Sequence, residues 1–165
     1  MRLIAAAVFA FLVAGCSLLG GSPSPSIPVA PPPGAPTPAP TIDLKVLARE
    51  YLTVAGDSNK AHAELLATCG GTLSLSRQKT CFRREAEIEQ TLLKAYTELK
   101  VPPELEQEFA GLRQAVAAYD AVLRQGAAVK TTAQLRAIRP KIDKAAAAVT
   151  AAANKVRAKL GLPSV

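Results

Sequence analysis

Three cysteines and a single histidine carry the most specific chemistry in this sequence. Cys16 closes the run Val13-Ala14-Gly15-Cys16, which follows a positive start at Arg2 and an apolar stretch that begins at Leu3. A short positive start, an apolar run and a small-residue cleavage site are the three parts of a secretion signal. Cys16 therefore lies directly after the expected cleavage site of a leader, residues 1–15.

This ending resembles the lipobox of bacterial lipoproteins. The resemblance implies that Cys16 receives a diacylglyceryl thioether and becomes the new N-terminus. It also implies a lipid anchor in the cell membrane, with the chain outside the cytoplasm, on the outer face of the plasma membrane or the periplasmic side. Residues 3–15 are too few for a helix that crosses a bilayer, which takes about 20. The alternative is an ordinary secretion signal cut near Ala14.

Cys69 and Cys81 form an even pair once Cys16 is assigned to lipid. In an exported chain, such a pair favours a disulfide. The closed loop is short, which limits the expected stabilisation to roughly 3 kcal/mol. Redox or metal-binding thiols are the alternative, but the pair lacks the Cys-x-x-Cys spacing that those thiols use.

His62 could be a metal ligand or a general base. The sequence has no repeated Glu-x-x-His pairs, and its one methionine is Met1, so we expect no metal, haem or other cofactor. Glu85, Glu87 and Glu89 alternate with apolar residues on an expected helix, which predicts a solvated face rather than a chelating site. No set of nucleophile, base and orienting group is evident, and we expect a protein that is not an enzyme.

Positive charge is concentrated at the C-terminal end of the chain. The net charge of +7 lies after residue 129, where eight cations face one acid, while residues 1–129 are balanced. These cations predict a surface for anionic lipid or cell-wall polymer, and the candidate residues are Arg136, Arg139, Lys141, Lys144, Lys155, Arg157 and Lys159. Alternatively, they only solvate the outer side of a helix. Nucleic acid is not an expected partner, because residues 131–160 contain no aromatic side chain that could stack on a base.

Three segments position these residues. Residues 1–15 form the leader, and residues 16–41 contain the lipidated cysteine and a disordered linker with nine of the thirteen prolines. Residues 42–165 have the 3-and-4 apolar spacing of helices. Four helices are expected, of which the first carries Tyr51 and His62 and stops at Gly70. Short connections predict an all-α, up-down-up-down four-helix bundle with Cys69 and Cys81 at matching heights.

The inward stripes of the later helices can be read from the same spacing. The second helix is predicted to bury Cys81, Ile88, Leu92, Ala95 and Leu99. The third is predicted to bury Leu105, Phe109, Leu112, Val116, Tyr119 and Leu123, and to stop near Gly126. The fourth begins with a capping box at Thr131 and Gln134, runs to Gly161, and is expected to kink or split at Pro140.

We therefore expect a lipid-anchored, non-enzymatic interaction or scaffold module that meets an unknown envelope protein or an anionic surface. The alternative is a binding protein or sensor for a small apolar ligand, held between the alanine-rich fourth helix and its neighbours. The segment from Tyr51 to Asn59 and the closing Leu160 to Pro163 are also similar to uncharacterised helical lipoproteins of bacterial envelopes.

Overall fold

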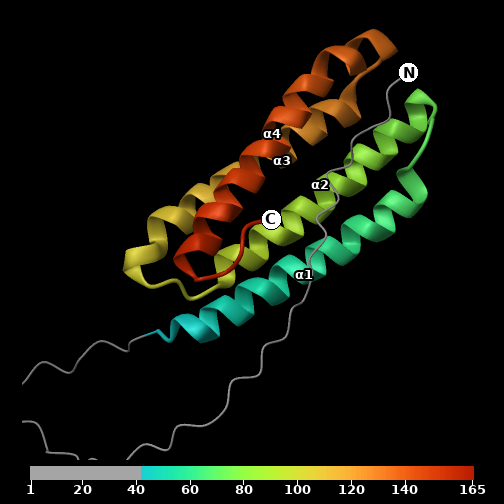
Figure 1. Cartoon of the computed structure of the whole chain (residues 1–165). Coiled ribbons are helices and arrows are strands. Elements are labelled where there is room, and N and C mark those ends of the chain that lie inside the picture. The colour runs from blue at the N-terminus through green and yellow to red at the C-terminus, as the bar shows by residue number, and fades with distance from the viewer. Residues whose placement is uncertain (1–41) are drawn as a thin grey trace, which may run out of the picture.

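The computed structural model describes residues 42–165, which form four long helices packed against each other, with no strand in this part of the chain. Cys16, the leader and the proline-rich linker lie outside the described residues. Helices α1 (Leu44–Cys69), α2 (Leu75–Glu98), α3 (Glu106–Ala128) and α4 (Thr132–Lys159) follow one another as antiparallel neighbours (Figure 1). The prediction of an all-α four-helix bundle is confirmed.

Local capping chemistry fixes where the helices begin. The side chains of Asp43, Ser74 and Thr131 accept hydrogen bonds from backbone N–H groups at the starts of α1, α2 and α4. At α4 the predicted capping box is complete, because the Gln134 side chain accepts from the Thr131 backbone in return. A 3-10 turn, Pro103–Leu105, precedes α3. These caps satisfy backbone donors that would otherwise have no partner.

Two positions were expected to interrupt or end helices. Pro140 does not split the last helix, because α4 continues through it from Thr132 to Lys159. Helix α3 ends at Ala128, near Gly126 as expected. A Cβ at Gly126 would lie 3.1 Å from the Phe82 ring, so this glycine lets α2 and α3 approach each other.

The core consists of two clusters of buried side chains. The basal cluster lies at the end of the bundle where α2 connects to α3, and it contains side chains from all four helices. Its members are Leu47, Tyr51, Leu92, Tyr96, Leu105, Phe109, Leu112, Val116 and Val156. The distal cluster lies at the other end and contains Phe82, Ala86, Tyr119, Leu123, Val129, Leu135, Ile138 and Ile142. All these distal residues come from α2, α3, α4 or the α3–α4 connection. The second half of α1 is therefore held against the bundle by contacts other than the two core clusters.

One attachment is covalent. Cys69 at the end of α1 and Cys81 in the second turn of α2 form the predicted disulfide, with their Cα atoms 5.9 Å apart. The bridge closes the connection that contains Gly71, whose φ of +83° favours glycine. No helix within residues 42–165 has the length and apolar character needed to span a bilayer.

Candidate functional site

Glu89 is the main departure from the predicted pattern of burial. Glu89 is 3% exposed, although the sequence predicted that it belongs to a solvated acidic face. Glu85 is half-buried, and of the three acids only Glu87 is exposed. The core face of α2 runs through Phe82, Ala86, Glu89 and Tyr96, so a carboxylate occupies a position where the helical spacing calls for an apolar side chain.

His62 on α1 supplies the counter-charge for Glu89. Its Nε2 lies 3.1 Å from Glu89 Oε1, and its Nδ1 lies 2.9 Å from the backbone carbonyl oxygen of Ser58. Both neighbours are acceptors when Glu89 is ionised, so both ring nitrogens must carry a proton. In this arrangement His62 is an imidazolium ion whose charge is neutralised by Glu89.

The environment of His62 favours this charged form. Burial lowers the pKa of His62, but the hydrogen bond and charge of Glu89 raise it, as do the Ser58 carbonyl and the charge of Glu85. The net result is a pKa above the ordinary value of 6.5. The ion pair is therefore present at mildly acidic pH and is lost as the pH rises through the pKa of His62.

A second, partly buried contact adjoins the first. The Tyr119 hydroxyl on α3 donates a hydrogen bond to Glu85 Oε1 on α2. Burial raises the pKa of Glu85 above its ordinary value of 4.5, against the lowering effects of the Tyr119 hydrogen bond and the His62 charge. Burial also raises the pKa of Tyr119, which keeps the phenol protonated as a donor. The residues His62, Glu85, Glu89 and Tyr119 are called the polar cluster below.

The polar cluster does not form an activated nucleophile. Ser58 Oγ lies 3.4 Å from His62 Nδ1, and Glu89 lies on the far side of the ring, an order that resembles a serine, histidine and acid set. Nδ1, however, already donates its proton to the Ser58 carbonyl and has no lone pair for the serine proton. No group of three or more His, Cys, Asp or Glu side chains within residues 42–165 could hold a metal ion.

Arg157 does not belong to the predicted basic surface. It is 3% exposed, and its Nε donates to the backbone oxygen of Pro163. Its charge also partly offsets the effect of burial, which raises the pKa of the Tyr51 hydroxyl. The Tyr51 ring stacks on Tyr96 at 5.7 Å, so the guanidinium adjoins an aromatic pair at the basal end.

The other predicted cations lie along α4 with different exposures. Arg136, Lys141, Lys144, Lys155 and Lys159 are exposed, whereas Arg139 is half-buried and its charge acts on Glu85. Lys159 Nζ lies 3.4 Å from Glu108 Oε1 on α3. The four remaining exposed cations make no ion pair with any residue of the described chain, and they are distributed around the solvent-exposed side of α4. Arg136, Lys141, Lys144 and Lys155 are called the α4 basic face below.

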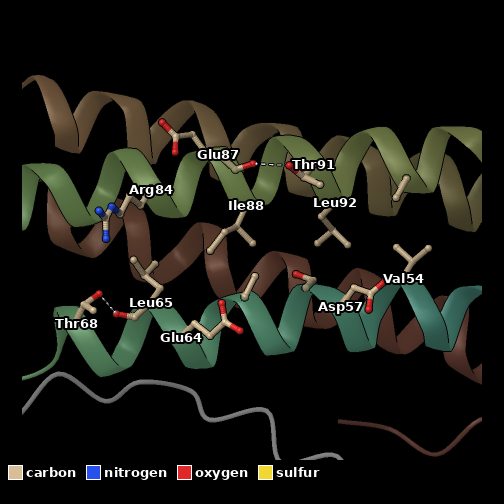
Figure 2. A pocket seen from close by; sticks show the side chains of 13 residues that line it. Val54, Asp57, Glu64, Leu65, Thr68, Arg84, Glu87, Ile88, Thr91 and Leu92 are labelled. Carbon is tan, nitrogen blue, oxygen red and sulfur yellow. Dashed lines mark hydrogen bonds between the residues drawn. The ribbon is translucent and has the colours of Figure 1, made fainter.

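An open hollow of about 530 Å³ lies beside the start of α4, where the polar side chains of Gln125, Lys130, Gln134 and Lys141 line it together with Val129 and Ile138. An open groove of about 540 Å³ lies between α1 and α2. Figure 2 shows Leu65 of α1 and Ile88 and Leu92 of α2 directed into the space between the two helices. Exposed acids at its margin, Asp57, Glu64 and Glu87, outnumber the one cation, Arg84. This is called the α1–α2 groove below.

Part of the site could be found from sequence and part could not. Cys69, Cys81 and the exposed α4 cations were found from residue type and spacing. The pairing of Glu89 with His62 was missed, although Phe82, Ala86, Glu89 and Tyr96 keep the 3-and-4 spacing of a buried face. An acidic residue in a series of buried apolar positions could have indicated that Glu89 is buried and needs a partner of opposite charge. No family model, curated protein or solved structure matches the chain.

Proposed function

We propose that this protein is a lipid-anchored, non-enzymatic interaction module of a bacterial cell envelope, and that the α4 basic face binds an anionic surface. The anchor rests on the sequence around Cys16. The binding role rests on one observation, the four exposed cations of α4 that make no ion pair with any described residue. Each cation near an anionic membrane surface contributes about 1 kcal/mol, so four make a useful affinity when the chain is already held close by lipid.

The anchor has a direct test. Mass spectrometry of the protein from bacterial membranes should show an N-terminal peptide that begins at Cys16 and carries acyl chains. A Cys16→Ala variant should then be released from the membrane fraction. Recovery of an unmodified N-terminus at another residue would remove the anchor from the proposal without affecting the binding role of α4.

The binding role is tested with a chain that starts at residue 42 and contains every described helix. Its binding to vesicles that contain anionic lipid should weaken as salt rises, because the attraction is screened. Replacement of Arg136, Lys141, Lys144 and Lys155 by Gln should weaken binding at least tenfold, since about 1 kcal/mol per cation is lost.

A matched variant separates this face from net charge. Lys45, Arg49, Lys60 and Arg77 are also exposed and make no ion pair with any residue of the described chain, so replacing them by Gln removes the same charge elsewhere. This control should bind nearly as well as the parent. Equal loss in both variants would show attraction to net charge alone and would contradict a dedicated face. Purified cell-wall polymer in place of vesicles distinguishes the two anionic partners.

The α1–α2 groove supports a second candidate function, which is binding of a small apolar ligand. Its volume falls within the range of ligand sites, about 300–1,000 Å³, and its walls include Leu65, Ile88 and Leu92. A neutral naphthylamine dye should fluoresce on binding, and Ala61→Phe should fill the groove and abolish the signal. Ala147→Phe, on the exposed side of α4, is the control that should leave dye binding unchanged.

A further inference from the structure

We propose that the His62–Glu89 ion pair is a pH-dependent latch: it holds the middle of α1, residues 56–66, against α2, and this segment detaches when His62 loses its proton. The proposal is independent of the binding functions above. It rests on how α1 is attached, on how Glu89 is compensated, and on which groups surround the pair.

The first half of α1 is fixed by packing, and the second half is not. Leu47 and Tyr51 belong to the basal cluster, and Ala55 is the last fully buried residue of the helix. None of the described side chains that form or pack against the distal cluster comes from α1. Beyond Ala55, α1 is held by the His62–Glu89 pair, by the disulfide at Cys69 and by half-buried contacts along the groove.

Glu89 depends on His62 for its stabilisation. Its Oε1 faces His62 Nε2, and its Oε2 is buried with no hydrogen-bond partner among the described residues. A buried carboxylate that loses its counter-ion is strongly destabilised. Deprotonation of His62 removes the positive charge and leaves Glu89 in the core. Water that reaches the carboxylate restores its solvation, and water enters if α1 moves away from α2.

The groups around the pair do not replace the lost charge. Glu85 on α2 adds a second carboxyl group, and Tyr119 on α3 already donates to Glu85. Asp143 on α4 adds negative charge near Tyr119, and Tyr96 is neutral. Arg139 on α4 has a positive charge that acts on Glu85, and Arg157 on α4 has one that acts on Tyr96. The charges that act on His62 itself are those of Glu89 and Glu85, and both favour its protonated form.

The segment has a weak point at one end and a covalent stop at the other. Gly56 lies inside the helix, where glycine is less favourable than alanine by roughly 1 kcal/mol, and nothing lies within 4 Å of the position of its missing Cβ. The Cys69–Cys81 bridge keeps the far end against α2. Residues 56–66 supply Asp57, Ser58, Ala61, Glu64 and Leu65 to the groove, so detachment reshapes its α1 wall.

Hydrogen exchange and NMR on the full chain test the latch together. His62 is the sole histidine, so its ring resonances give its pKa without an assignment problem. After correction for the intrinsic exchange rate, amide protection in residues 56–66 should fall as pH rises through that pKa. The loss should reach about tenfold for each unit by which the pKa exceeds 6.5. Amides of α3 residues 109–123 should keep their protection.

Three variants make the outcome decisive. His62→Gln should leave residues 56–66 weakly protected at every pH. Glu89→Gln removes the buried charge and should abolish the pH dependence of protection, so it provides the test if His62→Gln does not fold. Glu64→Gln, an exposed acid in the same segment, should behave like the parent. The proposal is overturned if protection of residues 56–66 follows that of α3 across the pH range, or if the His62 pKa lies at or below 6.5.

Discussion

Tyr119 on α3 donates a hydrogen bond to Glu85 on α2, so a phenol from one helix stabilises a half-buried carboxyl group on the next. The contact lies where the distal cluster borders the polar cluster, since Tyr119 belongs to both. Removing the donor should leave the half-buried Glu85 carboxyl group without its neutral partner.

Tyr119→Phe should therefore lower the free energy of unfolding by about 1–3 kcal/mol, the usual cost of leaving a buried acceptor unpaired. Urea denaturation of the parent and the variant measures this difference. A double-mutant cycle with Glu85→Gln provides the control, because Tyr119→Phe should cost less when Glu85 is already altered. Additive effects of the two changes would show that the hydrogen bond contributes nothing.

The pH dependence of stability should carry the signature of His62. Because its folded pKa lies above 6.5, its contribution to stability is complete below the unfolded value and is lost as pH rises through the folded pKa. The pKa of Glu85 is also raised above its ordinary value of 4.5, so its contribution to stability is likewise lost as pH rises through its folded pKa.

The difference in unfolding free energy between the parent and His62→Gln should thus be largest at about pH 5–6 and smaller above the His62 pKa. Denaturation at a series of pH values gives this difference directly. A difference that grows with pH would mean that the neutral ring is the stabilising form.

Loss of the disulfide should destabilise the fold without changing its helices. The bridge joins residues 12 apart in sequence, and chain-entropy arguments assign roughly 3 kcal/mol to a loop of this size. The double variant Cys69→Ser and Cys81→Ser should unfold at lower urea and should keep its helical circular dichroism. Reduction of the parent is the matched comparison and should give the same midpoint.

Two glycines of α3 should respond to alanine in opposite ways. At Gly111 nothing lies within 4 Å of an added Cβ, so Gly111→Ala should stabilise the helix by roughly 0.5–1 kcal/mol. At Gly126 the Cβ would meet Phe82 at 3.1 Å and Ile142 at 3.4 Å, so Gly126→Ala should destabilise by about 1–3 kcal/mol through overpacking. Thermal unfolding of both variants compares the two sites, and a gain at Gly126 would show that Phe82 moves freely.

The fold could be predicted well where burial follows from local spacing alone. The stripe from Leu105 to Leu123 is buried as expected, because its large apolar and aromatic side chains recur at the 3-and-4 spacing of one helix face. Capping at Thr131 and the pairing of Cys69 with Cys81 likewise depend on nearby residues.

Prediction failed where burial depends on a residue from a distant part of the chain. Glu89 is tolerated in the interior because His62, 27 positions earlier, supplies the opposite charge. Arg157 is buried because the chain after α4 turns back and offers the Pro163 carbonyl. Neither partner is implied by spacing on the helix itself, so both side chains were assigned to solvent. The α1–α2 groove was missed for a related reason, since half-buried side chains such as Leu65 and Ile88 leave α1 partly open along α2, whereas the sequence pointed only to the alanines of α4 as a ligand wall.

The covalent link between α1 and α2 also determines how the domain bears mechanical load. A pull applied at Leu44 enters α1 at the end farthest from Cys69, so the noncovalent contacts between α1 and α2 lie between the point of load and the disulfide. At Cys69 the pull passes across the sulfur atoms to Cys81, so residues 70–80 are bypassed and never stretched. The bridge thus limits how far an extended molecule can lengthen before the three-helix remainder begins to yield.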